Sequence, residues 1–325
     1  MKVFDSDKIR NLAVVGHGDS GKTTLVSAIL YTSGAVNRMG RVEEGTTITD
    51  YAEDEIERKI TITTALAHCE WKGNKINLLD TPGYSAFVFD AKSPMAAAET
   101  ALVVIDAVSG VEVQTELVWG FAQEFDLPRI IVINKLDRDN SSFERALAAA
   151  QEAFGREVVA LQLPIGSEKD FRGVVDLVKN KAYIYEWYGN GSYREEEVPA
   201  NLKAEVDSQR EQLIEMIAES DDDLMEKFFE EGTLSDEEII GGLKSSIQSG
   251  AIYPVFCTGA SHNVGVKNLL DAVAELCPNP LQRGPVKAVN TKTEEECTIE
   301  VKAEGKPVAF VFKTLADPFA GRINL

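Results

Sequence analysis

The residues best suited to chemistry stand near the N-terminus, in the run Gly16-His17-Gly18-Asp19-Ser20-Gly21-Lys22-Thr23-Thr24. Its first eight residues match the phosphate-binding pattern GxxxxGK[ST]. Glycines let the backbone turn so that successive N–H groups point at phosphate oxygens. Lys22 can reach the β- and γ-phosphates of a nucleotide, and the Thr23 hydroxyl can bind Mg²⁺. A glycine-rich turn without a ligand is the alternative, but the pattern is complete and further motifs follow in order.

A second motif predicts which base is bound. Asn134-Lys135-Leu136-Asp137 follows the apolar run 130–133, so it stands at a strand end, where ligands bind in open α/β sheets. The Asp137 carboxylate can accept two hydrogen bonds from N1–H and the 2-amino group of guanine, a donor pair that adenine lacks. Asn134 can bond the guanine edge, and the Lys135 stem can lie over the ring. The sequence therefore predicts GTP and GDP as ligands.

Two further segments fit the γ-phosphate side of such a site. Asp80-Thr81-Pro82-Gly83 follows the apolar run 76–79, so Asp80 can hold Mg²⁺ through water and the Gly83 N–H can contact a γ-phosphate. Thr61 lies in the long segment before this strand, and its hydroxyl can complete the Mg²⁺ shell only when the γ-phosphate is present. Such a segment orders and disorders on hydrolysis. Both patterns are common in proteins. They support a γ-phosphate site only because of their positions in the sequence relative to the phosphate-binding loop.

A last loop fits the base side of the site. Thr258-Gly259-Ala260-Ser261 follows the strand-like run 253–257. The backbone N–H groups of Gly259 and Ala260 can contact the guanine carbonyl oxygen.

The elements that must position these motifs alternate along the chain. Strand-like apolar runs occur at 11–15, 76–79, 101–105, 130–133 and 252–257, and helix-like segments at 22–33, 113–125, 141–154 and 265–276. This alternation predicts an α/β fold of the P-loop NTPase type, with a mostly parallel sheet flanked by helices. Residues 61–70 add an antiparallel edge strand, joined by the turn at 72–74 to the strand at 76–79.

An inserted α+β subdomain is predicted at about 158–252. Residues 182–187 alternate like a strand and break at Gly189-Asn190-Gly191, a hairpin signal, and 200–231 read as helices. Residues 160–250 hold 21 acidic and 9 basic residues, a net of −12 within a chain of net charge −20. This acidity disfavours nucleic-acid binding through the overall field. Two interpretations remain open: a solvated acidic helix face, or a docking face for a basic partner.

The C-terminal part divides in three by composition. Pro278-Asn279-Pro280 ends a nucleotide-binding (G) domain of residues 1–280, and the polar residues 281–306 predict a linker. Residues 307–325, with a strand at 308–313, predict the start of a β-barrel domain. One strand cannot close a barrel, so we expect a piece of a longer protein, with a tail that is poorly ordered or held by a neighbour.

The composition of the chain indicates the cellular compartment in which the protein is expected. The hydrophobic fraction of 44% is ordinary for a globular protein, and no apolar run is long enough to cross a membrane. Charges at Lys2, Asp5 and Asp7 interrupt the apolar core that a signal peptide needs. The four cysteines lack the spacing of metal ligands, and we expect them to be free thiols, mostly buried. A cytoplasmic protein without a membrane partner is expected.

These motifs, with their spacing, resemble the translational GTPases, and the elongation factor G family in particular. The resembling segments are 162–166, 173–177 and 226–229 in the insert, 265–273 in the last G-domain helix, and 317–322 at the start of a second domain. Elongation factor Tu lacks that insert. The resemblance implies ribosome-stimulated GTP hydrolysis that drives translocation, and ribosome disassembly with a recycling factor. It also implies that the insert meets the ribosomal stalk protein, and that ribosomal RNA contacts come mainly from domains this chain lacks. The fragment is expected to be monomeric.

The resemblance makes Asp19, Lys22, Gly83 and residue 84 the candidate catalytic residues. The family usually has a histidine after DTPG, which orients the attacking water, but here it is Tyr84. Lys59 stands in place of the glycine of RGIT, and Gly18 and Ser20 replace the usual Ile and Ala. These departures resemble a second-type elongation factor G paralogue. A ribosome-protection or release-type GTPase, and a GTP-dependent ribosome-binding switch with impaired hydrolysis, remain the alternatives.

Overall fold

A seven-stranded sheet forms the centre of the computed structural model, which describes residues 2–302, 304–305, 307–317 and 319–325. The strand order is β2-β3-β1-β4-β5-β11-β6. All neighbours pair in parallel except β2, which runs antiparallel to β3 at the edge. The strands are β1 (Ile9–Val15), β2 (Ala65–Trp71), β3 (Asn74–Asp80), β4 (Thr100–Asp106), β5 (Arg129–Asn134), β6 (Val158–Ala160) and β11 (Tyr253–Cys257). The predicted α/β fold and its antiparallel edge strand are thereby confirmed.

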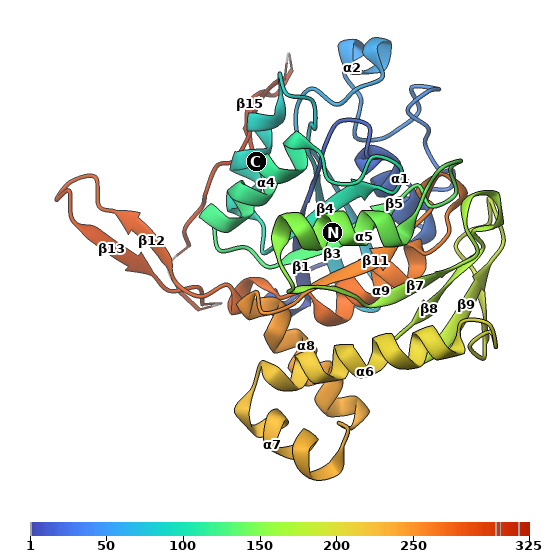
Figure 1. Cartoon of the computed structure of the whole chain (residues 1–325). Coiled ribbons are helices and arrows are strands. Elements are labelled where there is room, and N and C mark those ends of the chain that lie inside the picture. The colour runs from blue at the N-terminus through green and yellow to red at the C-terminus, as the bar shows by residue number, and fades with distance from the viewer. Residues whose placement is uncertain (1, 303, 306, 318) are drawn as a thin grey trace.

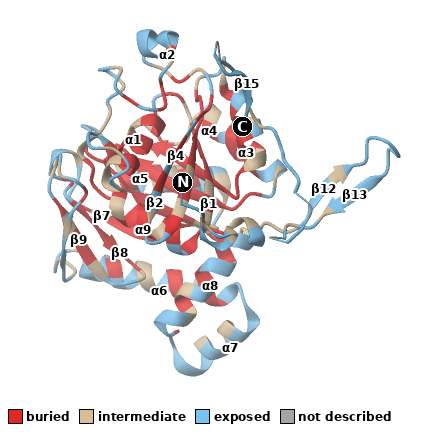
Figure 2. Ribbon diagram, turned by 180° about the vertical axis from the view of Figure 1, so that it is seen from behind, coloured by how far each residue is buried: buried red, intermediate tan, exposed pale blue. Residues whose placement is uncertain are grey.

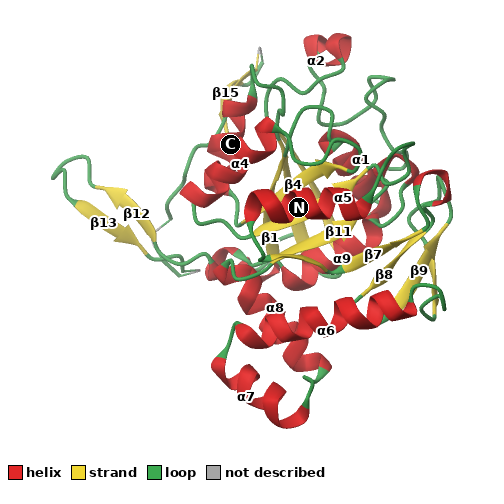
Figure 3. Cartoon of the chain, in the orientation of Figure 1, coloured by secondary structure: helices red, strands yellow, loops and turns green. Residues whose placement is uncertain are grey.

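Helices cover both faces of this sheet (Figures 1 and 3). They are α1 (Lys22–Thr32), α3 (Lys92–Ala97), α4 (Val113–Glu124), α5 (Phe143–Phe154) and α9 (Val266–Leu276), while the short α2 (Glu53–Arg58) stands at the rim. Helix α1 packs beside α9, and α3 packs beside α4. Strands β4 and β5 are buried along their whole length, as central strands of a covered parallel sheet must be. Figure 2 shows that buried residues gather on this sheet and on the inner sides of its helices.

A second, antiparallel sheet follows β6, with the order β10-β9-β8-β7. Its strands are β7 (Gln162–Ile165), β8 (Gly173–Asp176), β9 (Lys181–Tyr185) and β10 (Tyr193–Glu196). The predicted hairpin turn at 189–191 joins β9 to β10. Because β6 pairs with β11, the chain leaves the main sheet only after Ala160.

Three helices complete this part of the chain: α6 (Lys203–Glu219), α7 (Asp222–Glu231) and α8 (Asp236–Ser249). Helices α6 and α7 were predicted from the sequence. Helix α8 was not predicted, because its centre carries Gly241 and Gly242, both poor helix formers. A Cβ atom on Gly242 would stand 2.6 Å from Ile217 and 2.7 Å from Leu224. The glycine therefore allows α8 to approach α6 and α7 closely.

One prediction for the C-terminal part is wrong, and one hairpin there was not predicted. The predicted linker 281–306 contains a hairpin of β12 (Val286–Val289) and β13 (Glu296–Ile299), which projects from the body in Figure 1. The strand expected at 308–313 is instead irregular, and β14 (Thr314–Asp317) pairs with β15 (Gly321–Asn324). An apolar run needs a ladder partner to form a strand, and the nearby β15 supplies one for β14 only. Pro318, within the run 317–322, and Met1 lie outside the described residues.

Five short 3₁₀ turns occur among the described residues, at Ser6–Lys8, Val88–Ala91, Glu168–Asp170, Ala260–His262 and Pro280–Gln282. The cysteines are free thiols, with Cys69, Cys257 and Cys277 buried and Cys297 exposed. Among the helices of the described residues, none has the length and apolar character needed to cross a membrane.

One buried carboxyl group gives the fold a pH dependence. Glu99 lies just before β4 with 6% of its surface exposed, and its burial raises its pKa to about 7 despite Asn11 and Arg283 nearby. Between its ordinary pKa and about 7, the folded state binds more protons than the unfolded state, so stability falls as pH rises through this window.

Replacement of Glu99 by Gln is therefore expected to raise the free energy of unfolding at pH 8 by about 1–3 kcal/mol, with little change at pH 5. Urea denaturation at the two pH values measures this difference. An equal change at both pH values would contradict the raised pKa.

Candidate nucleotide-binding site

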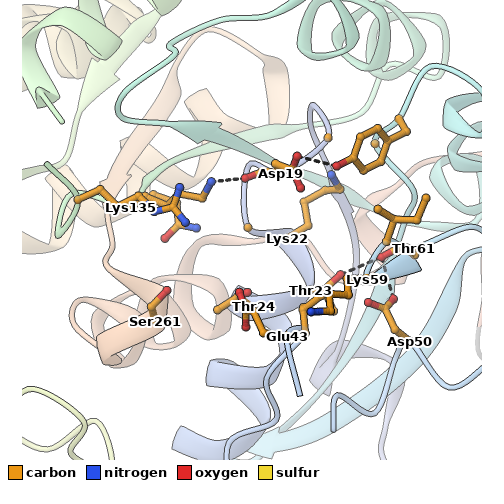
Figure 4. Close-up of a pocket in the computed structure, with 18 residues that line it drawn as sticks. Asp19, Lys22, Thr23, Thr24, Glu43, Asp50, Lys59, Thr61, Lys135 and Ser261 are labelled. Atoms are coloured by element: carbon orange, nitrogen blue, oxygen red, sulfur yellow. Dashed lines mark hydrogen bonds between the residues drawn. The ribbon is translucent and has the colours of Figure 1, made fainter. Parts of the chain in front are cut away.

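A cavity of about 390 Å³ opens at the carboxyl ends of the parallel strands (Figure 4). Of the residues predicted for the site, it is lined by Gly18, Asp19, Gly21, Lys22, Thr23, Thr24, Thr61, Gly83, Tyr84, Asn134 and Lys135. Ser261 of the predicted base-side loop also lines it, and so do residues that were not predicted for the site: Val42, Glu43, Asp50, Lys59, Ile60 and Arg138. The other predicted site residues do not line the cavity; they are Gly16, His17, Ser20, Asp80, Thr81, Pro82, Asp137, Gly259 and Ala260.

The phosphate-binding loop connects β1 to α1 and is held in a tight turn. Gly16 and Gly21 have φ angles of 145° and 91°. A Cβ atom would lie 2.3 Å from the Val104 carbonyl oxygen at Gly16, and 2.5 Å from Asn134 Nδ2 at Gly21. Both positions therefore require glycine for backbone shape and for space. Within the same loop, His17 Nδ1 accepts a hydrogen bond of 3.4 Å from the Gln114 N–H.

Lys22 points back over this loop. Its ammonium group donates to the carbonyl oxygens of Gly16 (3.1 Å) and His17 (2.7 Å). Gly83 lies against it, because a Cβ atom there would stand 2.2 Å from Lys22 Nζ. Burial lowers the pKa of Lys22, while Asp80 and Asp19 oppose that shift. A buried ammonium whose hydrogen-bond partners are neutral carbonyls suits the binding of an anion such as a phosphate.

Oxygen atoms gather beside the loop where Mg²⁺ is predicted. Thr23 and Thr61 share a hydrogen bond of 2.9 Å between their hydroxyls, and the Thr61 hydroxyl donates to Asp50 Oδ1 at 2.8 Å. Thr49 donates to Asp80 Oδ2 at 2.6 Å. Asp80 Oδ1 and Asp50 Oδ2 are buried without a hydrogen-bond partner, and burial raises the pKa of both carboxyl groups. This set of hard oxygen donors fits Mg²⁺.

Asp50 and Thr49 were not predicted as site residues. They come from the irregular segment between α1 and α2, where no spacing pattern marks a polar residue as a site residue. Only the folding of this segment over the phosphate loop brings them to Thr61 and Asp80.

Asn134, at the end of β5, ties two loops together. Its amide nitrogen donates to the Ser20 carbonyl oxygen at 3.0 Å. Its amide oxygen accepts from the Thr258 hydroxyl at 3.0 Å and from the Ala260 N–H at 3.1 Å. The phosphate loop and the base-side loop are therefore fixed relative to each other through one side chain.

Lys135 follows Asn134 with a φ angle of 63°. Its ammonium group is 2.7 Å from Asp106 Oδ2 and also donates to the Asp19 carbonyl oxygen. The ion pair is nearly buried, with 11% and 10% of the two side chains exposed. The stem of Lys135 is thus held along the cavity wall.

Asp137 is buried and has one free oxygen. Its side chain is 3% exposed, its Oδ1 has no hydrogen-bond partner, and its Oδ2 contacts His262 Nδ1. A Cβ atom on Gly259 would lie 3.1 Å from Oδ1, so the base-side loop approaches the carboxylate closely. A buried carboxylate oxygen without a partner is costly, and the donors of a guanine edge would satisfy it. His262 was missed by the sequence analysis.

Tyr84 occupies the position after the DTPG sequence, in a turn that Thr81 fixes by donating its hydroxyl proton to the Val14 carbonyl oxygen at 2.7 Å. The Tyr84 hydroxyl donates to Asp19 Oδ2 at 2.6 Å. Its ring lies over Gly18, where a Cβ atom would be 3.2 Å from the ring carbons. Burial and the Asp19 hydrogen bond raise the pKa of Tyr84 to about 12. A side chain larger than that of glycine at position 18 would press against the Tyr84 ring, so the two departures from the family pattern, Gly18 and Tyr84, depend on each other.

The fold and this cavity define the chain as a P-loop protein of the GTPase class. A family model described as the elongation factor Tu GTP binding domain matches residues 7–279. The chain belongs to this family of translational GTPases and is a GTP-binding domain.

The chain is also similar to a protein from Thermus thermophilus whose crystal structure is solved, with 35% sequence identity and a TM-score of 0.85. The match covers 98% of this chain and 45% of that chain, so this chain spans less than half the length of that protein.

Proposed function

We propose that this chain is the nucleotide-binding part of an elongation factor G-type GTPase that acts on the ribosome in the cytoplasm. The observation that carries this proposal is the combined α+β unit, β7 to α8, placed between β6 and β11 of a GTP-binding domain. On this proposal the G domain spans 1–280 with its insert at about 158–252, and 307–325 begin a second domain. Translocation, with ribosome disassembly as a related activity, would be the work of the whole protein.

The residues of the cavity suggest how GTP is handled. Residues 16–24 would hold the phosphates, with Lys22 facing the β- and γ-phosphates. Asp137, Asn134, Gly259 and Ala260 would select guanine. Thr23, Thr61 and Asp80 would hold Mg²⁺, which neutralises charge on the phosphate oxygens. Hydrolysis then depends on positioning an in-line water and stabilising the charge that develops on the γ-phosphate.

A nucleotide switch with slow hydrolysis is the second candidate, and the state of Tyr84 favours it. Its hydroxyl is already committed to Asp19, and a pKa of about 12 keeps the phenol neutral at physiological pH. A neutral phenol cannot supply the cationic character that a histidine offers near neutral pH. On this view GTP binding would control ribosome binding, and the chemical step would be weak.

Single-turnover GTP hydrolysis with vacant ribosomes tests both candidates. On the slow-switch candidate, the full-length protein hydrolyses GTP at least about 10-fold more slowly than its Tyr84→His variant, since positioned acid–base groups contribute about 100-fold or more. Tyr84→Phe is the matched control that keeps the ring over Gly18 and removes the hydroxyl. Equal, strongly ribosome-stimulated rates for the native and histidine proteins would contradict the slow-switch candidate and leave the active translocase.

The acidic insert is proposed to meet the ribosomal stalk protein, with the fragment itself monomeric. Part of its charge has a local role, because Asp221 caps α7 by accepting from the N–H groups of Asp223 and Leu224, and Glu238 accepts from the Ser235 N–H in the capping box of α8. Acids in a first helical turn also stabilise the helix dipole. Phe229, 79% exposed on α7, is an apolar residue within this acidic surface and gives a partner an apolar contact point.

A further inference from the structure

The β9–β10 hairpin of the insert is fastened to the base-side loop of the G domain. The Tyr188 N–H donates to the His262 carbonyl oxygen at 3.1 Å. Asn263 Nδ2 donates to the Gly189 carbonyl oxygen at 3.1 Å, and Asn263 Oδ1 accepts from the Thr32 hydroxyl at 2.9 Å. The hairpin, the base-side loop and the end of α1 therefore meet at one point beside Asp137.

His262 is the centre of this junction. Its ring stacks on Trp187 at 4.0 Å between centroids and 30° between planes. Its Nε2 lies 2.8 Å from the Tyr188 hydroxyl, and its Nδ1 contacts Asp137 Oδ2. A neutral imidazole satisfies both contacts at once when Nδ1–H donates to the carboxylate and Nε2 accepts from the phenol.

The indole beneath the histidine is itself held. Trp187 Nε1 donates to the Phe171 carbonyl oxygen at 2.8 Å. Phe171 is fully buried, and a Cβ atom on Gly259 would lie 3.2 Å from its ring. The stacking surface for His262 is thus anchored on the core of the insert and on the base-side loop together.

We propose that His262 is a positioning residue for base selection, through which the insert sets the affinity for guanine nucleotides. This inference rests on the proposed guanine site. A carboxylate bonds N1–H and the 2-amino group together only when both its oxygens lie in the plane of the base. Asp137 Oδ2 can accept from His262 and from the base, because a carboxylate offers about four lone-pair positions. The imidazole bond then fixes the rotation of the carboxylate, and Oδ1 stays free.

Dissociation constants and release rates for GDP and IDP, measured on the full chain, test this proposal. Hypoxanthine keeps N1–H and lacks the 2-amino group, so IDP makes one hydrogen bond to the carboxylate where GDP makes two. His262→Phe keeps a ring on Trp187 and removes both hydrogen bonds. We expect it to weaken GDP about 10-fold, to weaken IDP less than about 3-fold, and to speed GDP release. The preference for GDP over IDP should fall accordingly.

His262→Asn is the conservative variant, because its amide nitrogen can replace Nδ1 toward Asp137. It should restore most of the preference for GDP over IDP. Tyr188→Phe, which removes only the phenol hydroxyl, should produce an intermediate loss.

Three outcomes would overturn the proposal. An equal weakening of GDP and IDP, with a lower melting temperature, would mean that His262 only supports the loop. Unchanged constants would mean that it has no part in binding. Tighter GDP binding by His262→Phe would mean that the imidazole competes with guanine. Failure of the native chain to bind GDP at all would instead refute the guanine site on which the proposal depends.

Discussion

Lys22→Ala is expected to weaken GTP and GDP binding at least about 100-fold, which corresponds to about 3 kcal/mol. The Lys22 ammonium is buried between the phosphate loop and Gly83, with the carbonyl oxygens of Gly16 and His17 as its hydrogen-bond partners. A bound phosphate would replace neutral partners by a charged one, so the ligand gains more from this lysine than the empty loop does. Isothermal calorimetry measures the change.

Two controls make this result specific. Lys92→Ala removes a half-buried lysine that pairs with Glu124 at 2.7 Å, and it should bind GTP like the native chain. The melting temperature without nucleotide should change little in Lys22→Ala, because the variant removes a buried charge whose desolvation is already unfavourable. Micromolar or tighter GTP binding retained by Lys22→Ala would contradict the site assignment.

Asp137→Asn is expected to exchange guanine for xanthine as the preferred base. GDP should bind about 100-fold or more weakly, since the buried acceptor for N1–H and the 2-amino group is lost. Xanthine carries a carbonyl oxygen at position 2, which can accept from the new amide, so XDP should bind better than GDP. Competition against a fluorescent nucleotide, with GDP and XDP titrated separately, gives both constants.

Asp139→Asn is the matched control, because Asp139 lies two residues away with 68% of its side chain exposed. It should leave the preference for GDP unchanged. An Asp137→Asn variant that still prefers GDP as strongly as the native chain would refute the role of Asp137 in base selection. Because Asp137 also contacts His262, circular dichroism should confirm that the variant keeps its fold.

Local patterns in the sequence were sufficient for six of the seven strands of the main sheet, but β6 (Val158–Ala160) was not predicted. The apolar runs, the phosphate loop and the strand-end motifs are each only a few residues long. Each pattern can therefore be recognised without knowing which distant segments it contacts. The order of the strands was not predicted, and the neighbours β6 and β11 are separated in the sequence by the whole insert. The strand at 308–313 could not be placed in this way, because a strand exists only with a partner, and the partner of the C-terminal strand is chosen by local hairpin geometry.

The sequence by itself determined the phosphate loop, the guanine-type residues at the end of β5, and the replacement of histidine by Tyr84. These are properties of single residues or of short spacings. The tertiary structure alone decided that Tyr84 packs on Gly18, that Asp50 joins Thr61, and that His262 joins Asp137 to Trp187 of the insert. Each of these contacts joins different segments of the chain, and no local periodicity records which irregular segments meet. Their positions depend on how the loops pack over the ends of the sheet, because burial and hydrogen bonding are satisfied there collectively.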